Sequence, residues 1–534
     1  MEERQGNKQH KGVVRLQAGV LDGIGALPIE IEASVRGSDF GHSMILGLAD
    51  ATIRESLQRI RSAFFSLRIP FPRGRLVINL APGRQRKAGT QMDLPLAVVL
   101  AALGGAIEPA ALRGKFFLGE VGLDGRLLPV PGILGLTELA RDGGSDLLVC
   151  PHENAPLAAR AGGDLGILPC GDLEEVLIGI LKGKWKQARE VPEPSLLRAD
   201  ETRPHPSLLR GFEEEVPDLS RVKGQEQARV ALCLAAAGGH NLLMSGPPGC
   251  GKTLLARCMQ GLLPPLPEEQ RLEVLRVRTS TGVENQRDLC EFLHLGRPPF
   301  RAPHHTISSA GLVGGGSPPG PGEASLAHRG ILFLDELPEF QRACLETLRQ
   351  PLETGLVSIC RSKSRADFPA DFQLIAAMNP CPCGRLGHPR LPCTDTPTAI
   401  RRYRARISGP LLDRMDLRLD LSPVPAHTIL EDSMGDQPQS PALRERIHDL
   451  QRLQRERNGG VLNAKLSEME LRNPKHLVEK ARKLLVKACL RDDLSARGIS
   501  RVLRTARTAA DWAGNEKIQE EDLATALHFY KREG

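Results

Sequence analysis

Gly246-Pro247-Pro248-Gly249-Cys250-Gly251-Lys252-Thr253 is the stretch that decides the fold of the central part of the chain. It matches the pattern G-x-x-x-x-G-K-[ST], in which backbone N–H groups of a glycine-rich loop surround phosphate oxygens. The apolar run from His240 to Met244 precedes the loop, and a helical pattern from Leu254 to Leu263 follows it. The helix N-terminus faces the phosphates, while Lys252 reaches the β and γ phosphates and Thr253 can hold Mg²⁺. The stretch predicts an α/β domain that binds ATP with Mg²⁺.

A second apolar segment ends in two carboxylates. Asp335 and Glu336 directly follow the run Gly330-Ile331-Leu332-Phe333-Leu334. Such a run is typical of a buried parallel strand, and open α/β sheets bind ligands beyond the carboxyl ends of these strands. We expect Asp335 to be the carboxylate on the Mg²⁺ side and Glu336 to orient water for attack on the γ phosphate. The pair indicates a hydrolase; the alternative is a core strand followed by a capping acid.

A third apolar strand, Phe372 to Met378, is followed by Asn379. An amide at the end of that strand can hydrogen-bond both the γ phosphate and the attacking water, so Asn379 is a candidate sensor of bound nucleotide. The alternative is a turn residue before Pro380.

The composition indicates a soluble protein of two or three domains. The chain has 534 residues, of which 41% are hydrophobic and 25% charged, and a single core rarely extends that far. The polar start, Met1 to Lys11, does not resemble a secretory signal. The run Leu94 to Ile107 is shorter than the roughly 20 residues that span a bilayer. We expect no membrane association, and the scattered single cysteines favour a reducing cytoplasm.

Changes of pattern divide the chain into four parts. Residues 12–182 alternate β-branched runs with helical patterns, which indicates an α/β domain. Residues 183–210 collect charges and prolines, as linkers do. Residues 211–425 contain the strands described above, and residues 441–534 have helical periodicity with few strand signals. The last part is therefore predicted to be a helical lid.

Five stretches together resemble the magnesium-chelatase-like AAA+ ATPases of the ComM/YifB family. They are Gly246 to Thr253, Phe300 to Thr306, Gly330 to Glu336, Asn379 to Gly384 and Ile407 to Arg414. The resemblance covers nearly the whole chain. It implies a central AAA+ P-loop core and a ring of identical chains, a hexamer, with ATP bound between subunits.

The resemblance also assigns roles to two arginines. Arg414 is similar to the arginine finger of related minichromosome-maintenance helicases, which enters the neighbouring site and stabilises transferring charge. Arg497 is similar to the second sensor, which moves with the helical lid, and Arg501 is a rival for that role. A surface ion pair is the alternative for either residue.

The N-terminal part resembles the Lon protease domain, a ribosomal-S5-like α/β fold. The likeness lies in Gly119 to Val130, followed by a helix and the strand at Leu147. A Lon-type site needs a serine nucleophile and a lysine base. The positions that correspond to them hold Gln91 and Leu134. We therefore expect a catalytically inactive scaffold or partner surface and not a protease.

Cys381, Cys383 and Cys393 are the clustered cysteines of the chain. Three thiolates could hold Zn²⁺, which prefers four tetrahedral ligands. Members of the family usually carry a second closely spaced pair, but Asp395 stands at the partner position here. Asp395 or His388 could complete the site; otherwise the segment is a reduced, structural loop.

Two kinds of molecule are candidates for what this ATPase acts on. The resemblance favours DNA, because ComM-type proteins are implicated as helicases that drive branch migration during homologous recombination in natural transformation. Basic residues at Arg401, Arg402, Arg404 and Arg406 could contact phosphates. The alternative is a chelatase-like ATPase that remodels a protein partner. Residues 303–322, which begin with Pro303-His304-His305, are interpreted as a mobile glycine-rich insert facing the ring pore.

Overall fold

The computed structural model describes residues 12–37, 43–84, 87, 89–183, 186–187, 216–316, 318–361, 364–388, 391–425, 428, 439–471 and 476–530. The chain forms two compact units. The first comprises Met1–Pro206 and Arg271–Leu295, and the second comprises Ser207–Gln270 and Gly296–Gly534. Most of the predicted linker, 183–210, lies outside the described residues. Within it, the short strand β10 (Lys186–Gln187) pairs with β9 of the first unit.

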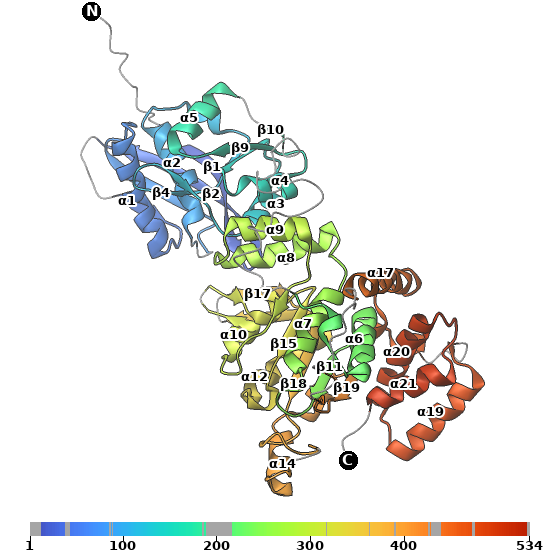
Figure 1. The fold of residues 1–534 in the computed structure, drawn as a ribbon. Helices are drawn as coiled ribbons and strands as arrows, with labels where there is room; N and C mark the ends of the chain where they lie inside the picture. The colour runs from blue at the N-terminus through green and yellow to red at the C-terminus, as the bar shows by residue number, and fades with distance from the viewer. Residues whose placement is uncertain are drawn as a thin grey trace, which may run out of the picture. The chain divides into compact units, whose positions relative to one another are not determined.

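The first unit has a mixed α/β architecture with two four-stranded sheets (Figure 1). One sheet has the order β1-β2-β4-β3, formed by Val14–Asp22, Gly25–Arg36, Arg75–Ala81 and Met44–Leu46. The other has the order β10-β9-β8-β5, in which β9, β8 and β5 are Gly166–Cys170, Leu147–Pro151 and Lys115–Phe117. A small hairpin joins β6 (Glu120–Val121) to β7 (Leu127–Leu128). Burial alternates along the first residues of β1, as expected for a strand with one face on the core.

Five helices pack with these sheets. They are α1 (Ala51–Ser66), α2 (Asp93–Leu103), α3 (Ile133–Asp142), α4 (Ala155–Gly162) and α5 (Leu173–Lys182). Every residue of α2 is buried, because this helix is apolar on all sides and lies at the centre of the core. The apolar run Leu94–Ile107 is therefore a core helix.

Most of a helical hairpin from the middle of the sequence belongs to the first unit. It consists of α8 (Glu268–Thr281) and α9 (Gln286–Leu295). Arg276 of α8 forms a 2.5 Å ion pair with Glu138 of α3, and the Gly132 N–H donates to the Thr279 carbonyl at 2.8 Å. The sequence placed these residues inside the continuous stretch 211–425, but residues 271–295 group with the N-terminal part.

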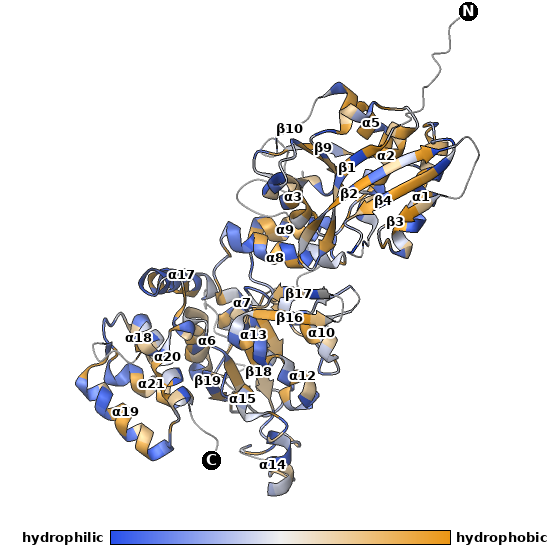
Figure 2. Cartoon of the chain, turned by 180° about the vertical axis from the view of Figure 1, so that it is seen from behind, coloured by the Kyte–Doolittle hydropathy of each residue, from blue (hydrophilic) through white to orange (hydrophobic). Residues whose placement is uncertain are grey.

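The second unit is built on a five-stranded parallel sheet with the order β12-β15-β18-β11-β19. These strands are Phe300–Arg301, Ile331–Leu334, Gln373–Met378, Leu242–Ser245 and Leu417–Asp420. All residues of β15, β18 and β11 are buried, which is why the sequence shows continuous apolar runs there. Apolar colouring marks β18 and polar colouring marks α17 (Ser440–Arg457) in Figure 2. The three predicted strands agree with β11, β15 and β18 to within two residues at each end.

Short helices and hairpins complete this core. The helices are α6 (Glu226–Gly238), α7 (Lys252–Leu262), α10 (Ser309–Val313), α11 (Glu323–Leu326), α12 (Arg342–Thr347), α13 (Arg349–Thr354), α14 (Pro397–Arg404) and α15 (Gly409–Leu412). The hairpins are β13–β14 (Gly314–Gly315, Gly320–Pro321) and β16–β17 (Leu356–Arg361, Ser364–Pro369). The segment interpreted as a glycine-rich insert thus contains α10 and the β13–β14 hairpin.

The C-terminal part of the second unit is helical. It consists of α17, α18 (Glu468–Leu471), α19 (Glu479–Asp492), α20 (Ala496–Ala513) and α21 (Glu520–Tyr530). Buried hydrogen bonds join this helical part to the core that contains the sheet. The Gln451 amide donates to the Ala236 carbonyl at 2.8 Å, and His240 Nε2 lies 2.7 Å from Thr508 Oγ1. None of the helices in the described ranges has the length and apolar character needed to cross a bilayer.

Candidate nucleotide site

The phosphate-binding loop lies between β11 and α7, and its backbone requires glycine at two points. Gly249 and Gly251 have φ values of 79° and 88°, a region that L side chains rarely adopt. Nothing lies within 4 Å of a Cβ built on either residue, so conformation and not crowding demands glycine there. Helix α7 begins at Lys252, two residues earlier than predicted. The helix N-terminus therefore falls at the residues that are to bind phosphate.

Lys252 is held by oxygen atoms of the loop and of a neighbouring strand end. Its Nζ donates to the carbonyls of Gly246 at 2.7 Å and Pro247 at 3.1 Å. It also donates to Oδ1 of Asn379 at 3.1 Å. Burial lowers the pKa of Lys252, while the nearby charges of Asp335 and Glu336 oppose that shift. The ammonium group is thus surrounded by groups that phosphate oxygens can replace.

The predicted Mg²⁺ ligands are neighbours. Thr253 Oγ1 donates to Asp335 Oδ2 at 2.8 Å. Thr253 is the second residue of α7, which follows β11, and Asp335 follows β15; the sheet places β18 between these two strands. A hydroxyl and a carboxylate oxygen are hard donors of the kind that Mg²⁺ takes together with water and phosphate. The donor set fits a magnesium ion bound with ATP.

Glu336 adopts an unusual backbone conformation and has a histidine partner. Its φ is 51°, which is uncommon for a residue other than glycine and costs roughly 1–3 kcal/mol. Its carboxylate lies 3.4 Å from Nδ1 of His305, and its side chain is 56% exposed. His305 also packs edge-on against Phe340, with ring centroids 6.4 Å apart. His305, which lies in the loop after β12, thus contacts the carboxylate of the predicted base.

Asn379 follows β18, which lies between β11, the strand before the phosphate-binding loop, and β15, the strand before Asp335. Besides its bond to Lys252, its backbone hydrogen-bonds the hydroxyl of Tyr403 on α14. Tyr403 is buried, and burial raises the pKa of its hydroxyl to about 12. Arg404 of the same helix donates to the Pro380 carbonyl at 3.3 Å. Helix α14 is therefore attached directly to the sensor position.

Arg414 is paired within its own chain. Its guanidinium contacts Glu353 and donates to the Pro410 carbonyl at 2.9 Å. Burial lowers the pKa of Arg414, and the positive charges of Arg497 and Arg349 lower it further. Arg497 and Arg349 thus lie close to Arg414.

The two rival sensor arginines have different surroundings. Arg501 is 5% exposed and donates to the Met415 carbonyl at 2.9 Å and to the Tyr530 hydroxyl at 3.2 Å. Arg497 is exposed near the start of α20. Arg501 joins α20 to the turn after α15, whereas Arg497 is available to a ligand.

The basic cluster on and after α14 divides into two pairs. Arg404 bonds Pro380, and Arg406 forms a 2.8 Å ion pair with Glu339. Arg401 and Arg402 are exposed, and α14 stands out from the body of the second unit in Figure 1. Two of the four arginines therefore have structural partners.

The clustered cysteines also meet in the second unit. Cys381, Cys383 and Cys393 gather with Asp395, and the ligand atoms of all four residues lie within 4.8 Å of one another. His388 is not in this group; its Nδ1 accepts the Leu391 N–H at 3.0 Å. Of the two candidate fourth ligands, Asp395 lies with the three cysteines and His388 does not.

The positions that correspond to a protease dyad are buried in the first unit. Gln91 and Leu134 are each 1% exposed. Near Gln91, Asp93 is fully buried and accepts hydrogen bonds from Arg59 and Ser56. These contacts join α1 to α2 and leave no serine–lysine pair at the compared positions.

Three contacts of the site were not predicted from the sequence: His305 with Glu336, Tyr403 with Asn379, and Glu353 with Arg414. Each joins residues that are far apart in the chain. His305 had a signal in the adjacent histidines beside a strand. Tyr403 and Glu353 stand in ordinary helical patterns and had none.

Comparisons with known proteins agree along the chain. Residues 218–429 match the family described as magnesium chelatase, subunit ChlI; residues 31–154 match subunit ChlI of Mg-chelatase; and residues 437–530 match its C-terminal region. The protein YifB of Escherichia coli (strain K12) is 36% identical over 507 residues, covering 95% of this chain and 94% of YifB. The chain belongs to the magnesium-chelatase-like ComM/YifB family.

Two further relatives agree with this placement. The competence protein ComM of Haemophilus influenzae is 36% identical over 512 residues, which cover 95% of each chain. The magnesium-chelatase 67 kDa subunit of Heliobacterium mobile is 28% identical over 194 residues, covering 32% of this chain and 29% of that subunit. Membership of the ComM/YifB family implies ATPase activity with ATP and Mg²⁺.

Proposed function

We propose that this chain assembles into a hexameric ring that couples ATP hydrolysis to DNA remodelling, as a helicase that drives branch migration during homologous recombination in natural transformation. The observation that carries the proposal is the convergence of Lys252, Thr253, Asp335 and Asn379. It occurs in a chain that matches the competence protein ComM over 95% of its length. The N-terminal α/β domain, similar to an inactive Lon domain, serves as a scaffold in this proposal.

The residues of one chain would bind ATP and prepare the attacking water. The phosphates replace the carbonyl oxygens around Lys252, and Asn379 shares its amide between the γ phosphate and the water. Thr253 and Asp335 would hold Mg²⁺, which would supply neutralisation of phosphate charge. Glu336 accepts a hydrogen bond from the water and orients it once His305 releases the carboxylate.

The arginines would complete the site from a neighbouring chain. In the single chain, Glu353 neutralises Arg414 while Arg497 and Arg349 stand close by. We infer that subunit contact transfers Arg414 from Glu353 to the neighbour's γ phosphate, where it stabilises transferring charge. Arg497 acts as the second sensor, and the C-terminal helices act as the lid. Hydrolysis then depends on ring assembly.

The projecting α14 is the proposed contact with DNA. Arg401 and Arg402 are exposed on it, and phosphate contacts by such residues make binding sensitive to salt. Tyr403 and Arg404 join the same helix to Asn379 and Pro380. A shift of α14 when it binds DNA would therefore also shift Asn379 at the nucleotide site. This connection gives a physical route from DNA to hydrolysis.

The test measures ATPase rate with and without branched DNA, and strand exchange on a labelled three-stranded junction. We expect stimulation by DNA and binding that weakens with salt. The double variant Arg401→Ala/Arg402→Ala should lose stimulation and keep the DNA-free rate. Arg482→Ala/Arg491→Ala removes two exposed arginines from α19 and serves as the matched control. Equal losses in both variants would refute a specific role for α14.

The alternative is a chelatase-like ATPase that remodels a protein partner. The partial match to the Heliobacterium mobile subunit favours it. An ATPase that DNA does not stimulate, with no salt-sensitive DNA binding, would support this alternative and overturn the helicase proposal.

A further inference from the structure

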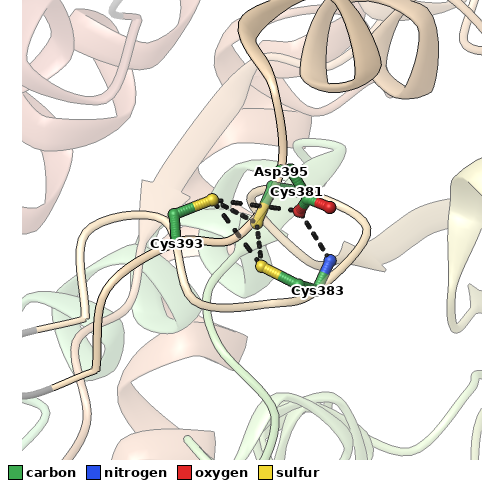
Figure 3. A group of neighbouring side chains, drawn as sticks. All are labelled: Cys381, Cys383, Cys393 and Asp395. Carbon is green, nitrogen blue, oxygen red and sulfur yellow. Dashed lines mark hydrogen bonds between the residues drawn. The ribbon is translucent and has the colours of Figure 1, made fainter.

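Three thiols and one carboxylate converge beside the nucleotide site (Figure 3). The Sγ atoms of Cys381 and Cys383 lie 3.4 Å apart, and each lies 3.6 Å from Sγ of Cys393. Asp395 Oδ2 lies 3.8 Å from the Cys393 sulfur. Among the residues that the structure describes, this is the one group of three or more metal-ligating side chains.

The spacing suits a tetrahedral metal site. With Zn–S bonds of about 2.3 Å, two thiolates of a tetrahedral zinc site lie roughly 3.8 Å apart. A thiolate and a carboxylate oxygen in the same site lie about 3.6 Å apart. Four of the six separations, 3.4 to 3.8 Å, are close to these values, and all six lie within 4.8 Å. The four donors therefore surround a common space.

Backbone N–H groups hold the sulfur atoms and the carboxylate in position. The Leu386 N–H points at Cys381 Sγ from 3.4 Å, and backbone groups of Arg385 and Thr394 hydrogen-bond Cys383. The Cys383 N–H donates to Asp395 Oδ2 at 2.8 Å and orients that carboxylate. Such outer-shell hydrogen bonds hold metal ligands in position. Cys381 is fully buried, and the other three residues are half-buried.

We propose that Cys381, Cys383, Cys393 and Asp395 bind one Zn²⁺, and that this ion clamps the segment between Asn379 and α14 against the phosphate-binding loop. Binding releases the thiol protons to solvent, since zinc takes cysteine as thiolate. The inference goes beyond the proposed function and does not depend on the nature of the load.

The clamped segment reaches the nucleotide site at both of its ends. Cys381 stands two residues after Asn379, and Asp395 directly precedes Thr396, whose side chain caps α14. In the middle, Gly384 has a φ of 74°, and a Cβ built on it would lie 2.6 Å from Cδ of Pro248. The cysteine loop therefore packs against the phosphate-binding loop. An ion holding this loop would hold Pro248, Asn379 and α14 in one arrangement.

The first experiment measures metal and uses no ATPase assay. Full-length protein purified under reducing conditions is supplied with Zn²⁺, dialysed and analysed for bound metal. We expect one zinc per chain, and close to none for Cys383→Ser or Asp395→Ala. Cys360→Ser removes an exposed thiol outside the group and should keep full occupancy, as should His388→Ala. Circular dichroism shows whether each variant folds.

A cobalt spectrum identifies the ligands. Replacement of zinc by Co²⁺ should give thiolate charge-transfer bands and the visible bands of a tetrahedral site. Asp395→Cys should raise the charge-transfer intensity by about one third, because four sulfur atoms replace three. An unchanged spectrum in Asp395→Cys would exclude Asp395 as the fourth ligand. Failure of the folded wild-type protein to retain metal would overturn the site itself.

The clamp has its own test. Zinc is stripped with a chelator, the chelator is removed, and the affinity for a fluorescent ATP analogue is measured. We expect the protein without zinc to bind the analogue about 10-fold more weakly and to recover when Zn²⁺ is restored. Changes around a metal site typically cost about 10- to 100-fold in metal affinity or activity. Unchanged affinity in a protein that loses and regains zinc would overturn the clamp. A protein that binds zinc but whose ATPase DNA does not stimulate would contradict the proposed function and leave the zinc site standing.

Discussion

Nζ of Lys252 lies 3.1 Å from Oδ1 of Asn379, so the phosphate-binding loop and the end of β18 share a hydrogen bond before any ligand is added. This bond places the amide of Asn379 where the γ phosphate would meet the lysine. We expect Asn379→Ala to lower kcat by about 100-fold, as removal of one transition-state donor does. ATP affinity, measured with a fluorescent analogue, should change little. A variant with normal turnover would refute the sensor role.

Glu336→Gln should bind ATP and fail to hydrolyse it. The amide keeps the shape of the side chain but cannot accept the proton of the attacking water, and loss of a general base costs roughly 10²- to 10⁴-fold in rate. Phosphate release and nucleotide binding measured on the same sample separate the two steps. Lys252→Ala is the companion variant and should lose binding as well.

His305→Ala should raise the basal ATPase rate. The imidazole lies 3.4 Å from the Glu336 carboxylate, so its removal frees the base for water. The matched control is His304→Ala, because His304 lies beside Thr306, with Nδ1 2.9 Å from its hydroxyl. A rate several-fold above wild type in His305→Ala alone, by phosphate release, would support the restraint. A fall to the level of Glu336→Gln would mean that His305 assists hydrolysis.

Mixing two inactive variants tests whether Arg414 acts on a neighbouring chain. Lys252→Ala lacks a working phosphate-binding loop, and Arg414→Ala lacks the finger. In mixed rings, some sites combine an intact loop from one chain with an intact arginine from the other. ATPase activity should therefore reappear on mixing. No recovery, with assembly verified by light scattering, would place Arg414 in its own chain's site or in packing.

Asp218 should stabilise the second unit in a pH-dependent way. Its carboxylate accepts the Gln439 and Ser440 N–H groups at 3.0 Å each, and Ser440 Oγ accepts the Leu219 N–H at 2.9 Å. Burial alone raises the pKa of Asp218, but the hydrogen bonds that its carboxylate accepts from Ser220, Gln439 and Ser440 outweigh burial and lower the pKa. We expect Asp218→Ala to reduce the free energy of unfolding by about 1 kcal/mol.

The sign of the pH effect follows from that lowered pKa. Stability from Asp218 is fully present above the pKa of an unfolded aspartate, about 3.9, and is lost as pH falls through the folded pKa. The difference in melting temperature between wild type and Asp218→Asn should stay constant near neutral pH and shrink below about pH 4. The control Asp449→Asn alters an exposed ion pair on α17 and should change stability within about 0.5 kcal/mol. A difference that grew on acidification would contradict the linkage.

Local patterns predicted the strands and helices that frame the nucleotide site. Buried parallel strands need continuous apolar residues, so β11, β15 and β18 were visible as runs. Element boundaries differed from the predicted ones by one or two residues, as at α7, which begins at Lys252 directly after the left-handed Gly251. The sequence did not predict that the hairpin α8–α9 packs with the first unit, because a helical pattern does not indicate which apolar surface the helix will cover.

The sequence alone determined the loop Gly246–Thr253, the acidic strand end at Asp335 and Glu336, and the membership of the chain in its family. These features depend on neighbours in the chain, through backbone conformation and strand hydrophobicity. Only the tertiary structure decided that His305 holds Glu336 and that Asp395 joins the three thiols. It also decided that Arg501 is buried while Arg497 is exposed. Those contacts join distant segments, and their geometry arises only when the sheet and the helices pack together.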